Sequence, residues 1–218
     1  MKHSICISGA AAGQSVDEGC GVAYELGMAI AKAGHIVTTG ATVGLPLYGA
    51  KGAVDAGGQS IGFSPAASMR EHVHKYRLPI GFFDYINFTG MHYIGRDIHL
   101  VQSSDAVITV GGRIGSLHEF TTALEAHMPC GVLVGSGGLA DFIPQILEEL
   151  EEPAGSRVVF DTDPERLVKK IIAMLDKETK DLKLKPLAEE WMVKSSICEP
   201  IAGKYGFTTG STKSTRMG

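Results

Sequence analysis

The residues best suited to chemistry lie between Ala106 and Glu119, in the segment AVITVGGRIGSLHE. A short apolar run ends there at a pair of glycines, and a helical pattern begins within the next few residues. Glycines let the backbone approach a bound group closely, and the first N–H groups of a helix are unpaired and lie at its positive end. A phosphate group, which carries close to two negative charges, suits such a site. The expected contact residues are Gly112, Arg113, Ile114, Gly115 and Ser116.

A purely structural interpretation of this segment stays open. Ser116 and Glu119 are three residues apart at the start of the expected helix, which is the spacing of a helix-capping arrangement. The glycines would then serve only a tight turn from strand to helix. The segment is not a Walker A loop, because no Gly-Lys-Ser/Thr follows, and it is not a GxGxxG motif.

The elements around this segment predict an α/β fold. Apolar runs typical of strands alternate with helical patterns along the first three quarters of the chain. Such alternation predicts a Rossmann-like, doubly wound and mostly parallel sheet with helices on both faces, which binds ligands at the carboxyl ends of its strands. The expected strands are residues 3–8, 36–39, 60–63, 85–88, 106–110, 132–134 and 158–160. The expected helices are residues 18–34, 46–57, 95–104, 116–128, 139–151 and 164–176.

A second glycine-rich turn follows the strand at 36–39. Gly40 and Gly44 have the same spacing as Gly111 and Gly115, and Pro46 suits the first turn of the next helix. We interpret the two turns as similar local solutions to one geometric problem. Gly40 and Gly44 are therefore a second group of candidate ligand contacts.

Composition limits the class of protein. The net charge of −4 gives no electrostatic reason to expect nucleic-acid binding. The four cysteines are scattered without a CxxC pair, which argues against a zinc site and against a disulfide framework. The chain shows no signal-peptide pattern and no apolar run of the ~20 residues needed to span a membrane, so we expect a cytoplasmic protein without a membrane partner.

Other candidate sites are weaker. His72 and His74 could suggest a metal pair, but their charged neighbours favour a solvated helix face, and no metal is expected. His118 should point to another face of its helix than Glu119, in a structural role. We expect one domain at residues 1–176 and a charged, then Gly/Ser/Thr-rich extension at 177–218 that is partly disordered.

Several segments together resemble the LOG ("lonely guy") family, once described as lysine decarboxylase-like. GGRIGSLHE resembles the family's GGxGTxxE loop, and Arg96 precedes Asp105 by nine residues, as the family's catalytic arginine precedes an aspartate. ICISGAAAG resembles the first nucleotide loop, which adds Ser8 and Gly9 to the candidate contacts. The segment TTGATVGLPLYGAKGAVDAGGQSIGFSP resembles the second strand–turn–helix–strand unit, so the resemblance covers about residues 3–176.

The resemblance implies an activity. Members of the family hydrolyse the N-glycosidic bond of nucleoside 5′-monophosphates such as AMP, without a cofactor, and are typically homodimers. Glu119 would stabilise the oxocarbenium-like state and orient or deprotonate water, and Arg96 would hold the substrate. The helices near 91–104 and 116–128 would lie at or near the dimer interface. A non-catalytic protein of the same fold, which carries or senses a nucleotide or a nucleotide-like cofactor, is the alternative.

The chain also departs from the family pattern. Arg113 stands where the motif usually has its second glycine, and its guanidinium could instead reach the phosphate. Asp97 replaces a lysine that usually follows the catalytic arginine, and Ser116 replaces a threonine. Without the resemblance, Arg96 would be interpreted as a surface helix residue that pairs with Asp97 or Asp105.

Overall fold

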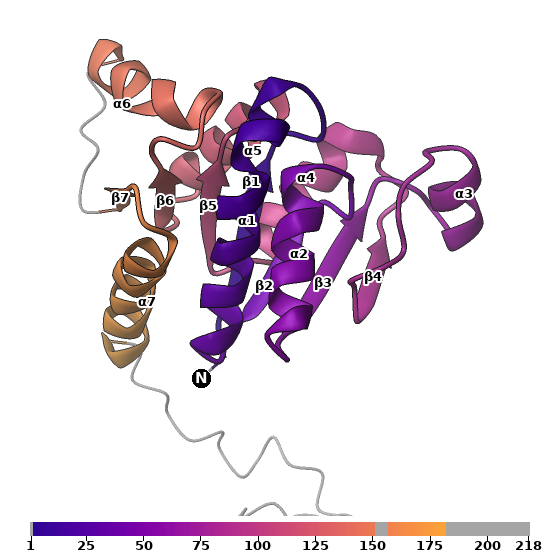
Figure 1. Cartoon of the computed structure of the whole chain (residues 1–218), viewed down its shortest axis with the longest axis horizontal. Helices are drawn as coiled ribbons and strands as arrows, with labels where there is room; N and C mark the ends of the chain where they lie inside the picture. Colours follow the sequence, from indigo (N-terminus) through magenta and orange to yellow (C-terminus); the bar gives the residue numbers. More distant parts are fainter. Residues whose placement is uncertain (1, 151–156, 182–218) are drawn as a thin grey trace, which may run out of the picture. The chain divides into compact units, whose positions relative to one another are not determined.

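The computed structural model describes residues 2–150 and 157–181, and its sheet lies in the unit formed by Met1–Lys180 (Figure 1). The strands are β1 (Ser4–Gly9), β2 (Ile36–Thr39), β3 (Gln59–Ser64), β4 (Tyr85–Phe88), β5 (Ala106–Val110), β6 (Cys130–Leu133) and β7 (Val158–Asp161). The helices are α1 (Gln14–Lys32), α2 (Leu45–Asp55), α3 (Met69–His74), α4 (His92–Gln102), α5 (Ile114–Glu125), α6 (Leu139–Glu149) and α7 (Pro164–Asp181).

The strands form one parallel sheet in the order β4-β3-β2-β1-β5-β6-β7. In the centre, Ile5 of β1 is paired with Val37 of β2 on one side and with Ala106 of β5 on the other. The chain therefore builds outward from β1 to one edge and then returns to start the other half at β5. This reversal between β1 and β5 is where a doubly wound sheet opens a crevice for a ligand. The expected α/β, Rossmann-like fold is confirmed.

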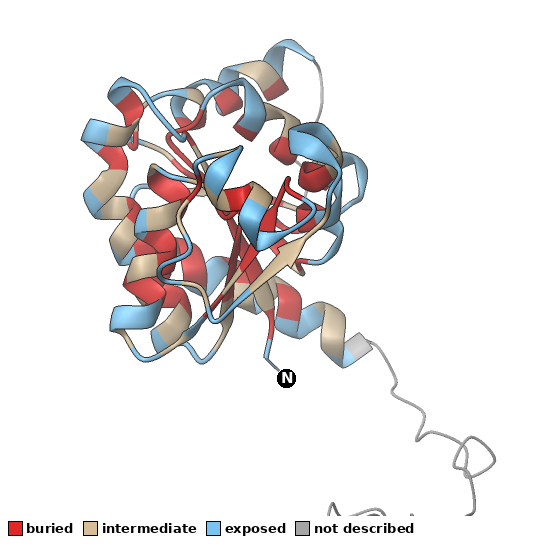
Figure 2. Cartoon of the chain, turned by 90° about the vertical axis from the view of Figure 1, so that its right-hand side faces the viewer, coloured by how far each residue is buried: buried red, intermediate tan, exposed pale blue. Residues whose placement is uncertain are grey.

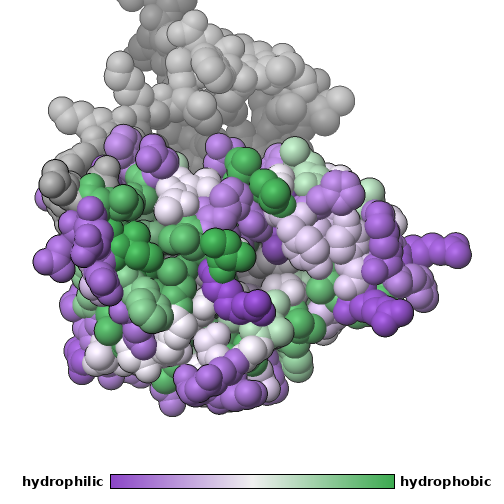
Figure 3. Space-filling model, turned by 90° about the horizontal axis from the view of Figure 1, so that it is seen from above, coloured by the Kyte–Doolittle hydropathy of each residue, from purple (hydrophilic) through white to green (hydrophobic). Residues whose placement is uncertain are grey.

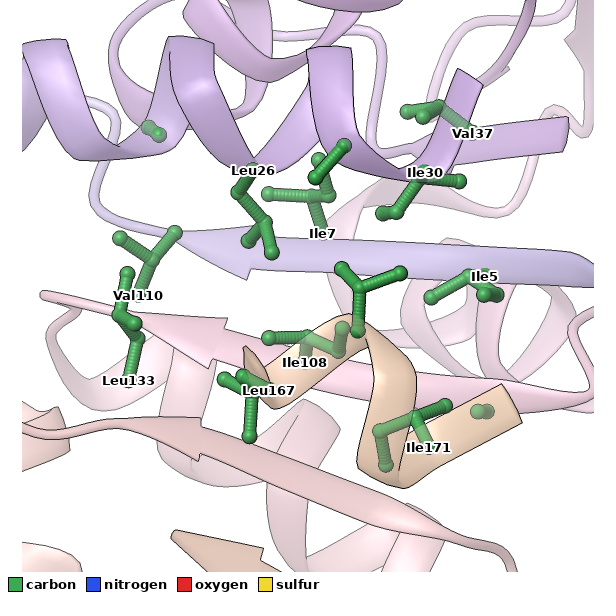
Figure 4. Close-up of a cluster of buried hydrophobic side chains, with 14 of the residues drawn as sticks. Ile5, Ile7, Leu26, Ile30, Val37, Ile108, Val110, Leu133, Leu167 and Ile171 are labelled. Atoms are coloured by element: carbon green, nitrogen blue, oxygen red, sulfur yellow. The ribbon is translucent and has the colours of Figure 1, made fainter. Parts of the chain in front are cut away.

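Helices cover both faces of the sheet. Figure 4 shows Leu26 and Ile30 of α1, with Leu167 and Ile171 of α7, packed around the β1 and β5 side chains of one face. On the other face, Phe120 of α5 and Ile143 of α6 belong to a second buried cluster. Its strand residues alternate along β1 and β5 with those of the first cluster. Figure 2 shows the buried residues concentrated along the strands and the inner faces of the helices. Alternate strand residues thus point to opposite faces, as the strand geometry requires.

The elements differ from the expected ranges mostly at their ends. The expected helix from residue 95 begins at His92, and the expected helix from residue 116 begins at Ile114. In the less regular segment 66–83, where only a helix face at His72 and His74 was expected, a short helix, α3, forms. The helix α7 continues through the charged residues to Asp181 and contains the expected domain boundary at 176, whereas residues 182–218 lie outside the described residues. None of the described helices is long and apolar enough to cross a membrane.

Candidate functional site

A cavity of about 290 Å³ lies at the carboxyl end of the sheet, beside the point where the strand order reverses. Its walls come from the loop after β1, the turn after β2, one face of α4 and the start of α5. Figure 3 looks onto the molecule from the side of these loops, where hydrophobic and hydrophilic side chains both reach the surface. The lining includes these predicted contact residues: Gly9, Gly40, Arg96, Arg113, Ile114, Gly115, Ser116 and Glu119.

Glu119 is a buried carboxyl group in the cavity wall. It comes from the second turn of α5, is 8% exposed, and its Oε2 accepts a hydrogen bond from the Ser8 hydroxyl at the end of β1. Burial raises the pKa of Glu119 to about 7, with Arg96 opposing this shift and Asp97 adding to it. Glu119 can therefore accept or donate a proton near neutral pH, which an ordinary surface glutamate does not do.

The helix-capping interpretation of Ser116 and Glu119 is wrong. The N-cap of α5 is Arg113, and no side chain makes a capping hydrogen bond there. The first backbone bond into the helix runs from the Leu117 N–H to the Arg113 carbonyl over 3.0 Å. The N–H groups of the preceding helical residues have no partner within the helix, so they are free to bind an anion.

The start of α5 has open space beside one glycine, whereas the turn before it is packed. Gly111 and Gly112 have φ values of 54° and 108°, which favour glycine, and Gly112 lies behind the cavity wall rather than in its lining. A Cβ added at Gly115 would meet no atom within 4 Å. The cavity is therefore open in front of the first turn of α5, where the phosphate was predicted to bind.

Arg96 is buried rather than exposed, so its interpretation as a surface residue is wrong. Its Nη1 donates to the carbonyl groups of Gly40, at the end of β2, and of Phe63, in β3, the latter over 3.2 Å. Its Nε donates to Asp97 Oδ1 over 2.9 Å, whereas Asp105 accepts from Ser4 instead. Nη2 has no hydrogen-bond partner among the described residues, and Arg96 lines the cavity, which leaves one donor group for a ligand.

Asp97 links Arg96 to α5. Its second oxygen, Oδ2, accepts a hydrogen bond from His118 Nδ1 over 3.1 Å. Asp97 itself is 6% exposed, and the guanidinium neutralises it, as a buried carboxylate requires. His118 thus joins α5 to α4 through its hydrogen bond to Asp97. This contact is compatible with the structural role expected for it.

Of the two glycines in the turn after β2 that were predicted to contact a ligand, only Gly40 lines the cavity. Gly40 lines the cavity, but a Cβ there would overlap the Arg96 guanidinium. Gly44 has a φ of 76° and is not part of the lining, because it packs against the backbone of the β1–α1 loop. Leu45 N–H donates to the Ala10 carbonyl over 2.9 Å, so the two loops hold each other.

Sequence reasoning missed several parts of the site. The segment ICISGAAAG was expected to form a ligand-binding loop, but only Ser8 and Gly9 were named in it, whereas Ala10, Ala11 and Ala12 also line the cavity. Thr42, in the turn after β2, and Pro46, at the start of α2, line it as well.

The loop after β6 was also missed as a support for the site. The Gly111 N–H donates to the Ser136 hydroxyl over 2.8 Å, and the Leu139 N–H donates to the Gly112 carbonyl over 3.0 Å. The GSGG run at 135–138 was its signal in the sequence.

The histidine pair on α3 does not form a solvated face. His72 is fully buried, its Nδ1 lies 2.8 Å from the Ser64 hydroxyl, and its Nε2 lies 2.8 Å from the Pro79 carbonyl. Only His74 is exposed, because the loop that follows α3 folds back over His72. Within the described ranges, no three His, Cys, Asp or Glu side chains are placed to hold a metal ion.

Solved structures with this architecture include cofactor-binding proteins. The molybdenum cofactor binding protein from the phototrophic bacterium Rippkaea orientalis is 25% identical, with a TM-score of 0.64, over 80% of this chain and 98% of its own. The Moco carrier protein from Chlamydomonas reinhardtii is 26% identical, with a TM-score of 0.64, over 84% of this chain and all of its own.

The sequence is also similar to a related protein and to a family model. An uncharacterized protein of Archaeoglobus fulgidus is 34% identical over 114 residues, which are 52% of this chain and 70% of the relative. The model of the SLOG cluster4 family matches residues 2–168, and so spans the sheet, the cavity and both helices that carry its charged residues. The chain therefore belongs to the SLOG cluster4 family.

Proposed function

We propose that this protein hydrolyses the N-glycosidic bond of a nucleoside 5′-monophosphate such as AMP, releasing the free base and ribose 5-phosphate. The proposal depends on one observation: Glu119 is a buried carboxyl group whose pKa is raised to about 7, and it lines the same cavity as Arg96. A perturbed carboxyl group in the crevice of a doubly wound sheet is a candidate for acid–base catalysis.

The cavity offers a place for each part of the substrate. The 5′-phosphate would bind the free N–H groups at the start of α5, in the open space before Gly115, with Arg113 at its edge. The ribose would then lie beside Glu119 and the free Nη2 of Arg96. The base would extend toward Tyr93, whose ring stacks over the Arg96 guanidinium carbon at 5.8 Å from the ring centroid.

The chemistry follows from this placement. As the C1′–N bond breaks, positive charge develops on the ribose, and the Glu119 carboxylate stabilises it. The same carboxylate accepts a proton from the attacking water, while the leaving base gains a proton on nitrogen. Arg96 holds the turn after β2 through its hydrogen bond to Gly40 and would also bind the substrate. It therefore contributes to substrate binding before the reaction as well as to the transition state.

The test is base release from AMP and other purine monophosphates, followed by chromatography of free base and ribose 5-phosphate. Glu119→Gln should lower kcat by about 100- to 1000-fold, the usual cost of one preorganised electrostatic group, with little change in binding. Glu125→Gln, an exposed residue on the same helix, is the matched control and should behave as wild type. Equal rates in Glu119→Gln and wild type would exclude this mechanism.

A carrier or sensor of a nucleotide-like cofactor is the second candidate. The specific observation is that the solved structures similar to this chain include a molybdenum cofactor binding protein and a Moco carrier protein. A cofactor that carries a phosphate group could bind the open first turn of α5 in the same way as a nucleotide. Tight binding of a nucleotide or of this cofactor, without base release from any common nucleotide, would favour the carrier.

We also propose a homodimer. Beside the cavity, α4 presents Ile94 and Ile98 one turn apart, 72% and 40% exposed, and Ile114 at the start of α5 is 81% exposed. A second copy that covers these side chains would remove apolar surface from water next to the site. Scattered free thiols such as Cys6 and Cys130 fit the reducing cytoplasm, where we expect the dimer to act.

Light scattering at micromolar concentration measures the assembly directly. Ile94→Lys should shift the mass toward the monomer, because a charge would be buried in the interface. Ile80→Lys, which changes an isoleucine that is 52% exposed in the loop before β4, is the control and should leave the mass unchanged. A wild-type monomer would contradict the proposal.

A further inference from the structure

Asp97 has no role in the proposed hydrolysis, although it lines the cavity together with Arg96 and Glu119. It is 6% exposed, and LOG proteins usually have a lysine at its position, so this chain carries a hydrogen-bond acceptor where the family pattern has a donor. A buried carboxylate is costly unless hydrogen bonds and a cation compensate for its lost hydration. The contacts of Asp97 therefore decide whether it can also receive a ligand.

Each carboxylate oxygen of Asp97 has acceptor capacity to spare. Oδ1 accepts a hydrogen bond from Arg96 Nε over 2.9 Å, and Oδ2 accepts one from His118 Nδ1 over 3.1 Å. Within the described ranges, these are the hydrogen bonds that the Asp97 side chain accepts. A carboxylate has about four lone-pair sites, so two remain for a hydroxyl group that enters the cavity.

Arg96 places a donor beside this acceptor. Its Nε binds Asp97, and its Nη1 binds the carbonyl groups of Gly40 and Phe63. Because the guanidinium is planar and is held at two of its nitrogens, its orientation relative to the Asp97 carboxylate is fixed. Nη2 is the nitrogen that has no partner among the described residues, so a fixed donor and a fixed acceptor lie in one wall of the cavity.

The hydroxyl groups of a ribose match this pair. They lie on neighbouring carbons, C2′ and C3′, so one hydroxyl can donate to Asp97 while the oxygen of the other accepts from Arg96 Nη2. A phosphate does not match it, because its oxygens are acceptors and its negative charge would face a carboxylate. The phosphate is better placed at the start of α5, which leaves the sugar for Asp97.

We propose that Asp97 accepts a hydrogen bond from a ribose hydroxyl and makes the site selective for ribonucleotides over deoxyribonucleotides. The inference rests on the proposed function, which places the ribose beside Arg96 and Glu119. Asp97 is then a specificity-determining residue, and its two protein contacts hold its carboxylate in place for the sugar.

The binding test uses calorimetry with AMP, 2′-deoxyAMP and 3′-deoxyAMP, in the full-length Glu119→Gln background so that no nucleotide is consumed. At least one deoxynucleotide should bind about 10- to 100-fold more weakly than AMP, which is the contribution of a hydrogen bond to a charged group. Adding Asp97→Asn should reduce this ratio to below about 10-fold, because a neutral amide oxygen is a weaker acceptor. Adding Asp97→Ala should abolish the ratio. Any displacement of Arg96 weakens all three nucleotides and cancels in the ratio.

Asp105→Asn is the matched control. Asp105 is also a hydrogen-bonded carboxyl group, since it accepts from the Ser4 N–H over 2.7 Å, but it does not line the cavity. This variant should keep the full preference for AMP. Should Asp97→Ala fail to fold, the comparison of Asp97→Asn with Asp105→Asn carries the test.

A kinetic comparison shows whether the hydrogen bond matters in the reaction. Hydrogen bonds to the 2′-hydroxyl strengthen as the oxocarbenium-like state forms. The ratio of kcat/KM for AMP to that for 2′-deoxyAMP should therefore fall at least tenfold from wild type to Asp97→Asn. The different intrinsic reactivity of the two nucleotides cancels in this comparison, because it is the same for both proteins.

The outcomes separate this inference from the proposed hydrolysis. Equal affinity for AMP and both deoxynucleotides, or a preference for AMP that survives Asp97→Ala, would overturn the role of Asp97 and leave the hydrolysis intact. A preference that depends on Asp97, without base release by wild type, would overturn only the hydrolysis. Absence of AMP binding would overturn both.

Discussion

The two glycine-rich turns have the same spacing and opposite surroundings. A Cβ added at Gly40 would overlap the Arg96 guanidinium and one at Gly44 would overlap the backbone of the β1–α1 loop, whereas one at Gly115, the counterpart of Gly44, would meet no atom within 4 Å. The first turn is therefore packed at both glycines, whereas the second ends in open space at the start of α5. Identical glycine spacing thus marks a chain turn, and the tertiary neighbours decide whether the space serves packing or a ligand.

This contrast predicts that changes around the first turn reduce the free energy of unfolding, whereas changes at the second reduce ligand binding. Arg96→Ala should have the largest effect, about 3–5 kcal/mol, because it leaves the Asp97 carboxylate buried without its cation. Urea unfolding measures this loss. Arg70→Ala, on the exposed side of α3, is the control and should remain within about 0.5 kcal/mol of wild type.

The pH dependence of stability should identify Glu119 as a carboxyl group whose pKa is raised in the folded protein. Its folded-state pKa of about 7 lies above the ordinary 4.5, so the folded protein holds a proton that the unfolded chain loses between these values. Its contribution to stability is present below pH 4.5 and is lost as the pH rises through 7. The loss is at most about 3.5 kcal/mol, since one pKa unit corresponds to about 1.4 kcal/mol.

Glu119→Gln removes this titration. The variant should gain stability relative to wild type as the pH rises from 4.5 to 8, and the difference between the two should be constant above pH 8. Unfolding curves at several pH values measure it. Parallel pH profiles of the two proteins would contradict the raised pKa.

Gly40→Ala tests the packed turn. The added methyl group must displace the Arg96 guanidinium, which is held by the backbone of two strands, so we expect a loss of about 1–3 kcal/mol from overpacking. Substrate binding should weaken as well, because Arg96 lines the cavity. A variant as stable as wild type would show that Arg96 can move without cost.

Gly115→Val should have the smallest effect on stability and the clearest effect on binding. The side chain would extend into the open space at the start of α5, so the free energy of unfolding should change by less than about 1 kcal/mol. Nucleotide binding, measured by calorimetry, should be lost because the isopropyl group occupies the phosphate position. Unchanged affinity would mean that the turn has only a structural role.

The local patterns of the sequence determined the class of fold and the positions of the turns. Strand residues 36–39 and 85–88 were predicted without error in their bounds, because apolar periodicity and neighbouring glycines act within a few residues. The pairing of Glu119 with Arg96 as candidates came from motif spacing in the resemblance to LOG proteins. Helix starts were less accurate, since the caps of α4 and α5 lack a side-chain hydrogen bond that would mark them.

Only the tertiary structure decided what these residues contact. The Ser8–Glu119 hydrogen bond joins residues 111 positions apart, and the Arg96–Gly40 bond joins residues 56 apart. His72 became buried because a later loop covers it, against the expectation from its charged neighbours. Burial also raised the pKa of Glu119, and burial depends on every element that packs around the side chain. Sequence patterns act over one or two turns of chain, whereas the environment of a side chain is set by segments that meet only after folding.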